Sequence, residues 1–86
     1  MNINEKLRDY FKMEENDVKR TLFWIKNGNN KWANPKEVIE NAKDRGMGAC
    51  IFAQSFDDED YSYEELERDY EQFKANLDSI KEEIMG

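Results

Sequence analysis

The chain has 86 residues, 38% of them hydrophobic and 38% charged, and its formal net charge at pH 7 is −7. A chain of this length forms one domain with a small core, because it buries only about 60–65% of its unfolded surface. Histidine is absent, as are the glycine motifs that bind phosphates and dinucleotides, which disfavours an enzyme, a bound cofactor or a small-molecule substrate. We therefore expect residues 1–86 to form a single non-enzymatic domain without catalytic residues.

The amino-terminal sequence and the single cysteine predict a cytoplasmic protein. The first residues, MNINEKLRDYF, lack the apolar core of an export signal, and no segment approaches the ~20 apolar residues of a membrane-spanning helix. Cys50 has no partner for an internal disulfide, and it lies in an apolar run rather than beside basic groups. We therefore expect a reducing compartment and no membrane association.

Two short amphipathic helices are expected before residue 28. The apolar residues of the first are Ile3, Leu7, Tyr10 and Phe11, and those of the second are Val18, Leu22 and Ile25. Asn16 or Asp17 is a suitable N-cap for the second helix, and Gly28 is a suitable terminator. The polar stretch around residue 15 is therefore expected to connect the two helices.

A third helix is predicted to begin at the sequence NPKE, residues 34–37. Asn34 supplies an N-cap, and Pro35 occupies the first helical position, where its missing amide hydrogen costs nothing. Gly46 and Gly48 are typical stop signals, but small and apolar residues keep a helical spacing through them. We expect one helix from Pro35 to about Ser55, whose small residues allow close packing of another helix. The alternative is a break at Gly46 followed by a short strand or turn.

The last helix has the most regular apolar pattern in the chain. Its apolar residues alternate between spacings of three and four: Tyr63, Leu66, Tyr70, Phe73, Leu77, Ile80 and Ile84. Ser62 and Glu65 match a capping box, in which the serine hydroxyl accepts a first-turn N–H and the glutamate reaches back to the serine N–H. The pattern predicts a long amphipathic helix from Tyr63 to Met85, in which Tyr63, Leu66 and Tyr70 are expected to be core residues. The chain is therefore expected to be all-α, a small bundle of about four helices.

The acidic residues are concentrated in residues 57–72, which hold nine carboxylates and one arginine, a local net charge of −8. A calcium-binding loop does not fit this stretch. A loop starting at Asp58 would place Tyr63 where a glycine makes the turn and Asp69 where a bidentate glutamate is needed. A loop starting at Asp57 would place Arg68 at that last position. No metal site is therefore expected.

A row of carboxylates makes this region a candidate partner-binding surface. Asp60, Glu64, Glu67 and Glu71 recur at helical spacing, about 5–6 Å apart, which is comparable with successive phosphates along a nucleic-acid strand. The residues expected to contact a partner are Asp57, Asp58, Asp60, Tyr61, Glu64, Glu67 and Glu71. We expect the partner to be a larger protein with a basic groove, which the row occupies as a nucleic-acid mimic. The simpler alternative is a solvated helix face near a helix N-terminus.

In size, acidity and lack of catalytic residues, the chain resembles the small accessory proteins of phages and mobile elements. Some of those proteins inhibit host nucleases as nucleic-acid mimics. This is a likeness of class that no shared motif carries, and it implies an inhibitor of a host defence protein.

Two other functions stay open at this point. Residues 18–45 have a local charge of +4 and two tryptophans, as in a small DNA-binding regulator. Its candidate contacts are Lys36, Lys43 and Arg45. The net charge of −7 disfavours direct nucleic-acid binding, as does the connection at residues 28–33, which is long for a helix-turn-helix. The third function is a structural homo-oligomer, in which the seam of the last helix pairs with a second copy as a homodimer.

Overall fold

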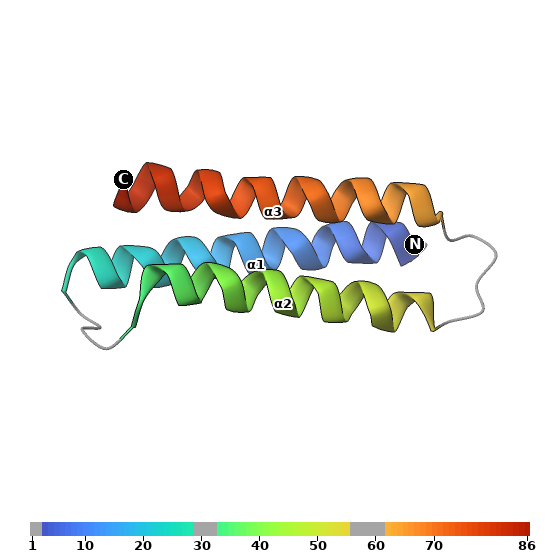
Figure 1. Cartoon of the computed structure of the whole chain (residues 1–86), viewed down its shortest axis with the longest axis horizontal. Helices are drawn as coiled ribbons and strands as arrows, with labels where there is room; N and C mark the ends of the chain where they lie inside the picture. The colour runs from blue at the N-terminus through green and yellow to red at the C-terminus, as the bar shows by residue number, and fades with distance from the viewer. Residues whose placement is uncertain (1–2, 29–32, 56–61) are drawn as a thin grey trace.

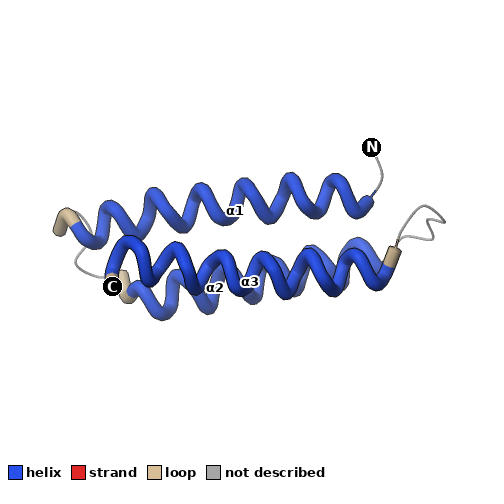
Figure 2. Tube along the Cα trace, turned by 90° about the horizontal axis from the view of Figure 1, so that it is seen from above, coloured by secondary structure: helices blue, strands red, loops and turns tan. Residues whose placement is uncertain are grey.

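A computed structural model describes residues 3–28, 33–55 and 62–86 of the chain. These residues form three α-helices, α1 (Ile3–Lys26), α2 (Pro35–Gln54) and α3 (Tyr63–Met85). Figure 1 shows the helices lying side by side along their lengths, with α2 running antiparallel to the other two. Viewed from above, α2 and α3 lie over one another and α1 lies to their side (Figure 2). The all-α class is confirmed, but the described residues form three helices rather than about four.

The connection expected near residue 15 is wrong, because α1 continues through it. No glycine or proline interrupts residues 12–17, and the charged residue at the centre of the stretch, Glu14, is buried. Arg45 of α2 pairs with it: Nη2 lies 2.8 Å from Glu14 Oε2, and Nε donates a hydrogen bond of 2.9 Å to the same oxygen. Gly28 ends the helix as expected, because it has a φ of 77°, and its N–H donates to the Ile25 carbonyl.

Replacing Arg45 with leucine is expected to lower the free energy of unfolding by about 1–3 kcal/mol, because the Glu14 carboxylate would stay buried without its charged partner. Replacing both Glu14 and Arg45 with leucine removes the buried charge and is expected to be close to neutral. Urea titrations followed by circular dichroism compare the two variants. A single variant as stable as the double variant would contradict the role we assign to this ion pair.

The helix α2 is continuous through both glycines, as expected. Asn34 Oδ1 accepts the Lys36 N–H at 2.9 Å, which caps the helix in front of Pro35. The two glycines have different surroundings. A Cβ atom on Gly46 would lie only 2.6 Å from the Phe73 ring, whereas a Cβ on Gly48 would meet nothing within 4 Å. Close packing through small residues is therefore found at Gly46 and not at Gly48.

The core runs along the axis between the three helices. At its centre the rings of Phe11 and Phe73 stack with their centroids 4.6 Å apart. The buried apolar residues are Leu7, Phe11, Val18, Leu22, Ile39, Ala42, Cys50, Ala53, Leu66, Phe73, Leu77, Ile80 and Ile84. No described helix combines the length and the apolar content that crossing a lipid bilayer requires.

The first residue of the predicted apolar seam of α3 is not in the core. Tyr63 is 51% exposed, whereas Leu66 is buried and Tyr70 is partly buried. A seven-residue repeat drifts by about 20° per heptad around a straight α-helix. Tyr63 lies one heptad before Tyr70, which is already at the edge of the core, so it falls outside. The expectation that Tyr63 is a core residue is wrong for this reason.

The start of α3 is held by a residue of α1 as well as by its own cap. The Ser62 hydroxyl accepts the Glu65 N–H at 3.3 Å, as the capping box predicts. The Ser62 N–H, however, donates to Asn4 Oδ1 at 2.8 Å, and Asn4 Nδ2 donates to the Ser62 carbonyl at 3.0 Å. The carboxylate of Glu65 lies instead 3.7 Å from Arg8. The second half of the predicted capping box is therefore wrong, because Asn4 takes the place of Glu65.

Candidate protein-binding face

The predicted partner-binding residues divide between described and undescribed parts of the chain. Glu64, Glu67 and Glu71 lie on α3 and are exposed. Asp57, Asp58, Asp60 and Tyr61 lie outside the described residues. The three glutamates occupy the side of α3 opposite the buried seam, since they are separated from one another by three and four residues and share one helix face. We call them the acidic row.

Two other carboxylates of the same stretch belong to the packing of the bundle. Asp69 Oδ2 accepts a hydrogen bond of 3.0 Å from Arg8 Nη1 of α1, and Glu65 Oε2 lies 3.7 Å from the same nitrogen. The hydrogen bond from Arg8 to Asp69 raises the pKa of the guanidinium above its ordinary value. These carboxylates fasten α1 to α3, so the acidic stretch contains a structural pair and a separate exposed row.

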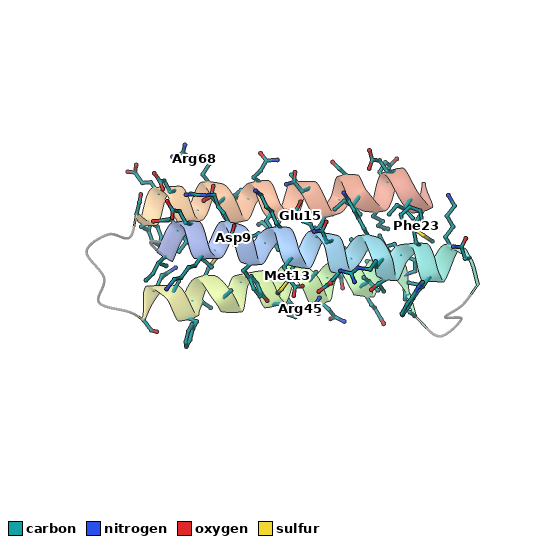
Figure 3. All side chains as sticks on the ribbon, turned by 180° about the vertical axis from the view of Figure 1, so that it is seen from behind. Asp9, Met13, Glu15, Phe23, Arg45 and Arg68 are labelled. Carbon is teal, nitrogen blue, oxygen red and sulfur yellow. The ribbon has the colours of Figure 1, made fainter. Side chains whose placement is uncertain are left out.

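The acidic row is only partly neutralised by cations. Lys74 Nζ lies 2.9 Å from Glu71 Oε1, and it also lies 4.9 Å from the centre of the Tyr70 ring. An exposed ion pair of this kind contributes only about 0–1 kcal/mol, so Glu71 can exchange Lys74 for another cation at little cost. Glu64 and Glu67 form no ion pair with any residue in the described ranges. Arg68 stands on the outer side of α3 (Figure 3).

Three large apolar residues beside this row are exposed. Met47 is 49% exposed, Ile51 is 62% exposed and Tyr63 is 51% exposed. Sequence reasoning placed Tyr63 in the core and did not single out Met47 or Ile51. The available signal was the sequence GMGACIFAQSF, residues 46–56, which contains no charged residue in a chain that is 38% charged. A helix that buries only one side leaves part of such a stretch in solvent.

Contacts between α2 and α3 place these residues on one surface. Lys43 Nζ reaches Asp78 Oδ1 at 2.9 Å, and the Tyr70 hydroxyl donates to the Lys43 carbonyl at 3.0 Å. On α2, Met47 and Ile51 follow Lys43 at intervals of four residues. On α3, Glu71, Glu67 and Glu64 precede Asp78 by seven, eleven and fourteen residues, so they lie on the same side of the helix as Asp78. Because the two helices are antiparallel, both series run in the same direction from the Lys43–Asp78 pair.

We call this surface the α2–α3 face. Its residues are Met47, Ile51, Tyr63, Glu67 and Glu71. Glu67, Glu71 and Tyr63 belong to α3, whereas Met47 and Ile51 belong to α2. Figure 1 shows α2 and α3 in front of α1. The face is therefore built on two packed helices, which fix the spacing of its side chains.

The basic residues proposed for DNA binding are largely engaged within the chain. Lys43 pairs with Asp78, and Arg45 pairs with the buried Glu14. Of the three candidate contacts, Lys36 alone is exposed without an ion pair among the described residues. The helices α1 and α2 also lie antiparallel along their lengths (Figure 1), which differs from the crossed pair of a helix-turn-helix. In the seam expected to pair a homodimer, Leu66, Phe73, Leu77, Ile80 and Ile84 are buried within one chain and Tyr70 is partly buried.

The buried thiol of Cys50 is chemically passive. The side chain is 5% exposed, and burial raises its pKa to about 11, with a smaller contribution from the Asp69 carboxylate. At pH 8 only about one thiol in a thousand is ionised, against about one in ten for an ordinary thiol near pKa 9. Because the folded pKa is the higher one, the thiol stabilises the fold below about pH 9, and this contribution is lost as the pH rises toward 11.

We expect iodoacetamide to modify Cys50 at least about tenfold more slowly in the native protein than in urea at pH 8. Mass spectrometry of a time course measures both rates. Equal rates in the native and unfolded protein would show that Cys50 is accessible and would contradict its place in the core.

The described residues offer little for metal or small-molecule chemistry. Within them, no three histidine, cysteine, aspartate or glutamate side chains gather closely enough to hold a metal ion. A depression of about 170 Å³ lies between α1 and α3, with Phe11 and Phe73 among its lining residues and the Arg8–Asp69 pair at its edge. Typical ligand pockets have volumes of about 300–1,000 Å³. The α2–α3 face is therefore the stronger candidate site.

No family model, curated protein or solved structure matches the chain. The function is therefore argued from the charge, exposure and contacts of the residues described above.

Proposed function

We propose that the protein is a non-enzymatic protein-binding module, an acidic inhibitor that occupies a basic, nucleic-acid-binding groove of a larger protein. The observation that carries this proposal is the separation of the acidic stretch into two sets. Glu65 and Asp69 pair with Arg8 between α3 and α1, whereas Glu64, Glu67 and Glu71 remain exposed on the opposite side of α3. The exposed set contributes little to the packing of the helices.

The mechanism of such an inhibitor is electrostatic steering followed by steric occupation of the groove. The carboxylates are spaced along a helix whose other side is core, so they need little ordering when they meet a row of arginines or lysines. Charge complementarity of this kind raises the association rate and weakens as salt screens it, with a Debye length of about 8 Å at physiological ionic strength. We therefore expect affinity for the partner to fall steeply as the salt concentration rises.

Affinity capture from a lysate of the native host tests this proposal with two matched variants. Glu64/Glu67/Glu71→Gln removes the acidic row, whereas Glu40/Glu82/Glu83→Gln removes three exposed negative charges elsewhere. We expect the unchanged protein and the second variant to retain a nucleic-acid-binding protein, which competing duplex DNA releases. The first variant should retain at least about tenfold less. Equal retention by both variants would remove the acidic row from the proposal.

A second candidate function is direct nucleic-acid binding by the end of α1. Phe23 is 51% exposed there, and Lys19 and Lys26, four residues before and three residues after it, are also exposed, which is a combination that suits stacking on bases. An electrophoretic shift with random duplex and single strands at low salt tests it. A shift abolished by Lys19→Glu and Lys26→Glu would favour this function over the inhibitor, whereas no shift would exclude it.

A further inference from the structure

The end of α1 carries a second surface of exposed apolar residues with the opposite charge. Phe23 is 51% exposed and Trp24 is 60% exposed. Lys19, Arg20 and Lys26 lie three or four residues from Phe23 on the helix and are also exposed, whereas Trp24 points about 100° away from Phe23. Residues 19–27 contain no acidic residue. The surface formed by Phe23, Lys19, Arg20 and Lys26 is called the α1 face. The Arg20–Asp17 contact, at 3.4 Å between two exposed side chains, neutralises it only weakly.

The two faces lie at opposite ends of the bundle and on different sides of it. Figure 3 shows Phe23 near one end of α1 and Arg68, which neighbours Glu67 in the chain, near the other end of α3. Figure 2 shows α1 to one side of α2 and α3. The two faces therefore do not meet within one chain, although they can meet when two copies lie head to tail.

We infer that the α2–α3 face of one copy binds the α1 face of a second copy. Each surface contains exposed apolar side chains: Met47, Ile51 and Tyr63 on one, and Phe23 on the other. Glutamates border the first surface, and lysines border the second. Burial of the apolar residues contributes about 25 cal/mol for each Å² removed from water, and the opposite charges fix the orientation.

The contact is heterologous, so each copy in a pair keeps one face unused. Such an interface closes into a ring or extends as an open chain of copies. Each face involves few residues, and the copies share a net charge of −7, so the association is of the weak and transient kind. The acidic row also carries the proposed function, so a basic partner and a second copy would compete for it. Self-association would therefore reduce the fraction of the protein that is free to bind the partner.

Sedimentation velocity at increasing protein concentration and low salt tests the inference without any partner. We expect the weight-average mass to rise with concentration and to return to that of the monomer at high salt. Two charge-reversal variants each change one side of the proposed contact. Glu67→Lys/Glu71→Lys changes the α2–α3 face, and Lys19→Glu/Lys26→Glu changes the α1 face. Each variant alone should associate at least about tenfold more weakly, because like charges then oppose one another. An equimolar mixture of the two should associate again.

Three results would overturn the inference. The first is a protein that stays monomeric at all concentrations, and the second is a mixture that fails to restore association. The third is association that both variants keep unchanged, which would place the interface elsewhere. A matched apolar pair adds a further control: Ile51→Gln should weaken association, whereas Met13→Gln, an exposed residue of α1 outside both faces, should not. Because no partner is present, failure here leaves the capture experiment on the acidic row unaffected.

Discussion

Replacing Phe73 with alanine is expected to lower the free energy of unfolding by about 3–5 kcal/mol, a large part of the total stability of a domain of this size. Phe73 is 1% exposed, stacks on Phe11, and packs against the backbone of Gly46, so it joins all three helices. Alanine would leave a cavity where the helices meet, and they can collapse into it only in part. Urea denaturation followed by circular dichroism measures the loss.

Phe23→Ala is the matched control, because Phe23 is half exposed and its loss should cost less than about 1 kcal/mol. If the two variants were equally stable, Phe73 would not lie at the centre of the core.

Gly46, which lies against the Phe73 ring, gives a second test of this packing. Gly46→Ala brings a Cβ to 2.6 Å from the Phe73 ring, so the ring must shift, and overpacking of this kind costs about 1–3 kcal/mol. In a Phe73→Leu background the same change should cost less, and a double-mutant cycle measures the difference. Gly48→Ala, in the same helix but in open space, should stabilise by about 1 kcal/mol through helix propensity. Equal effects at Gly46 and Gly48 would contradict the packing described here.

These glycines show what the sequence predicts about α2 and what it does not. The N-cap, the proline at the first position and the helical spacing of small residues are local signals, and they predict a continuous helix from Pro35. The helical spacing places Gly46, but not Gly48, in phase with Ala42, Ala49 and Ala53. That the Phe73 ring lies against Gly46 depends on the packing of α2 on α3.

The missed continuity of α1 has a related cause. A polar stretch between two apolar faces is typical of a connection, and Glu14 lies within that stretch. Its burial depends on Arg45, which is 31 residues away in the chain. A long-range ion pair of this kind leaves no mark on the local pattern, so the sequence predicted two short helices instead of one long helix.

The acidic half of the candidate site was predictable from the sequence, and its apolar half was not. The helical spacing of α3 placed Glu64, Glu67 and Glu71 on one side of the helix, and the structure agrees with this placement. The separation of Glu65 and Asp69 from that row required the position of Arg8 on α1. The exposure of Met47 and Ile51 required the direction in which α2 faces the core. The apolar half of the α2–α3 face was therefore missed.

Replacing Asn4 with alanine is expected to lower the free energy of unfolding by about 1–3 kcal/mol. Asn4 is 1% exposed, and its amide group exchanges two hydrogen bonds with the backbone of Ser62. Alanine would remove both bonds and leave the Ser62 N–H and carbonyl with water as their replacement partner at a half-buried position. Urea denaturation gives the size of the loss, and amide hydrogen exchange at Ser62 and Glu65 shows whether it is local to the start of α3.

Two variants separate the role of Asn4 from that of the local cap. Asn4→Asp keeps the acceptor for the Ser62 N–H, but it places a buried carboxylate oxygen against the Ser62 carbonyl, so at neutral pH it should lower the free energy of unfolding at least as much as alanine does. Glu65→Gln tests the capping box that the sequence predicts. Because Glu65 lies toward Arg8 and the Ser62 N–H is bound by Asn4, this change should leave the exchange rate of the Ser62 amide unaltered. A faster Ser62 amide in Glu65→Gln than in Asn4→Ala would show that the helix start is fixed locally, and the tie between the first turn of α1 and the start of α3 would then be secondary.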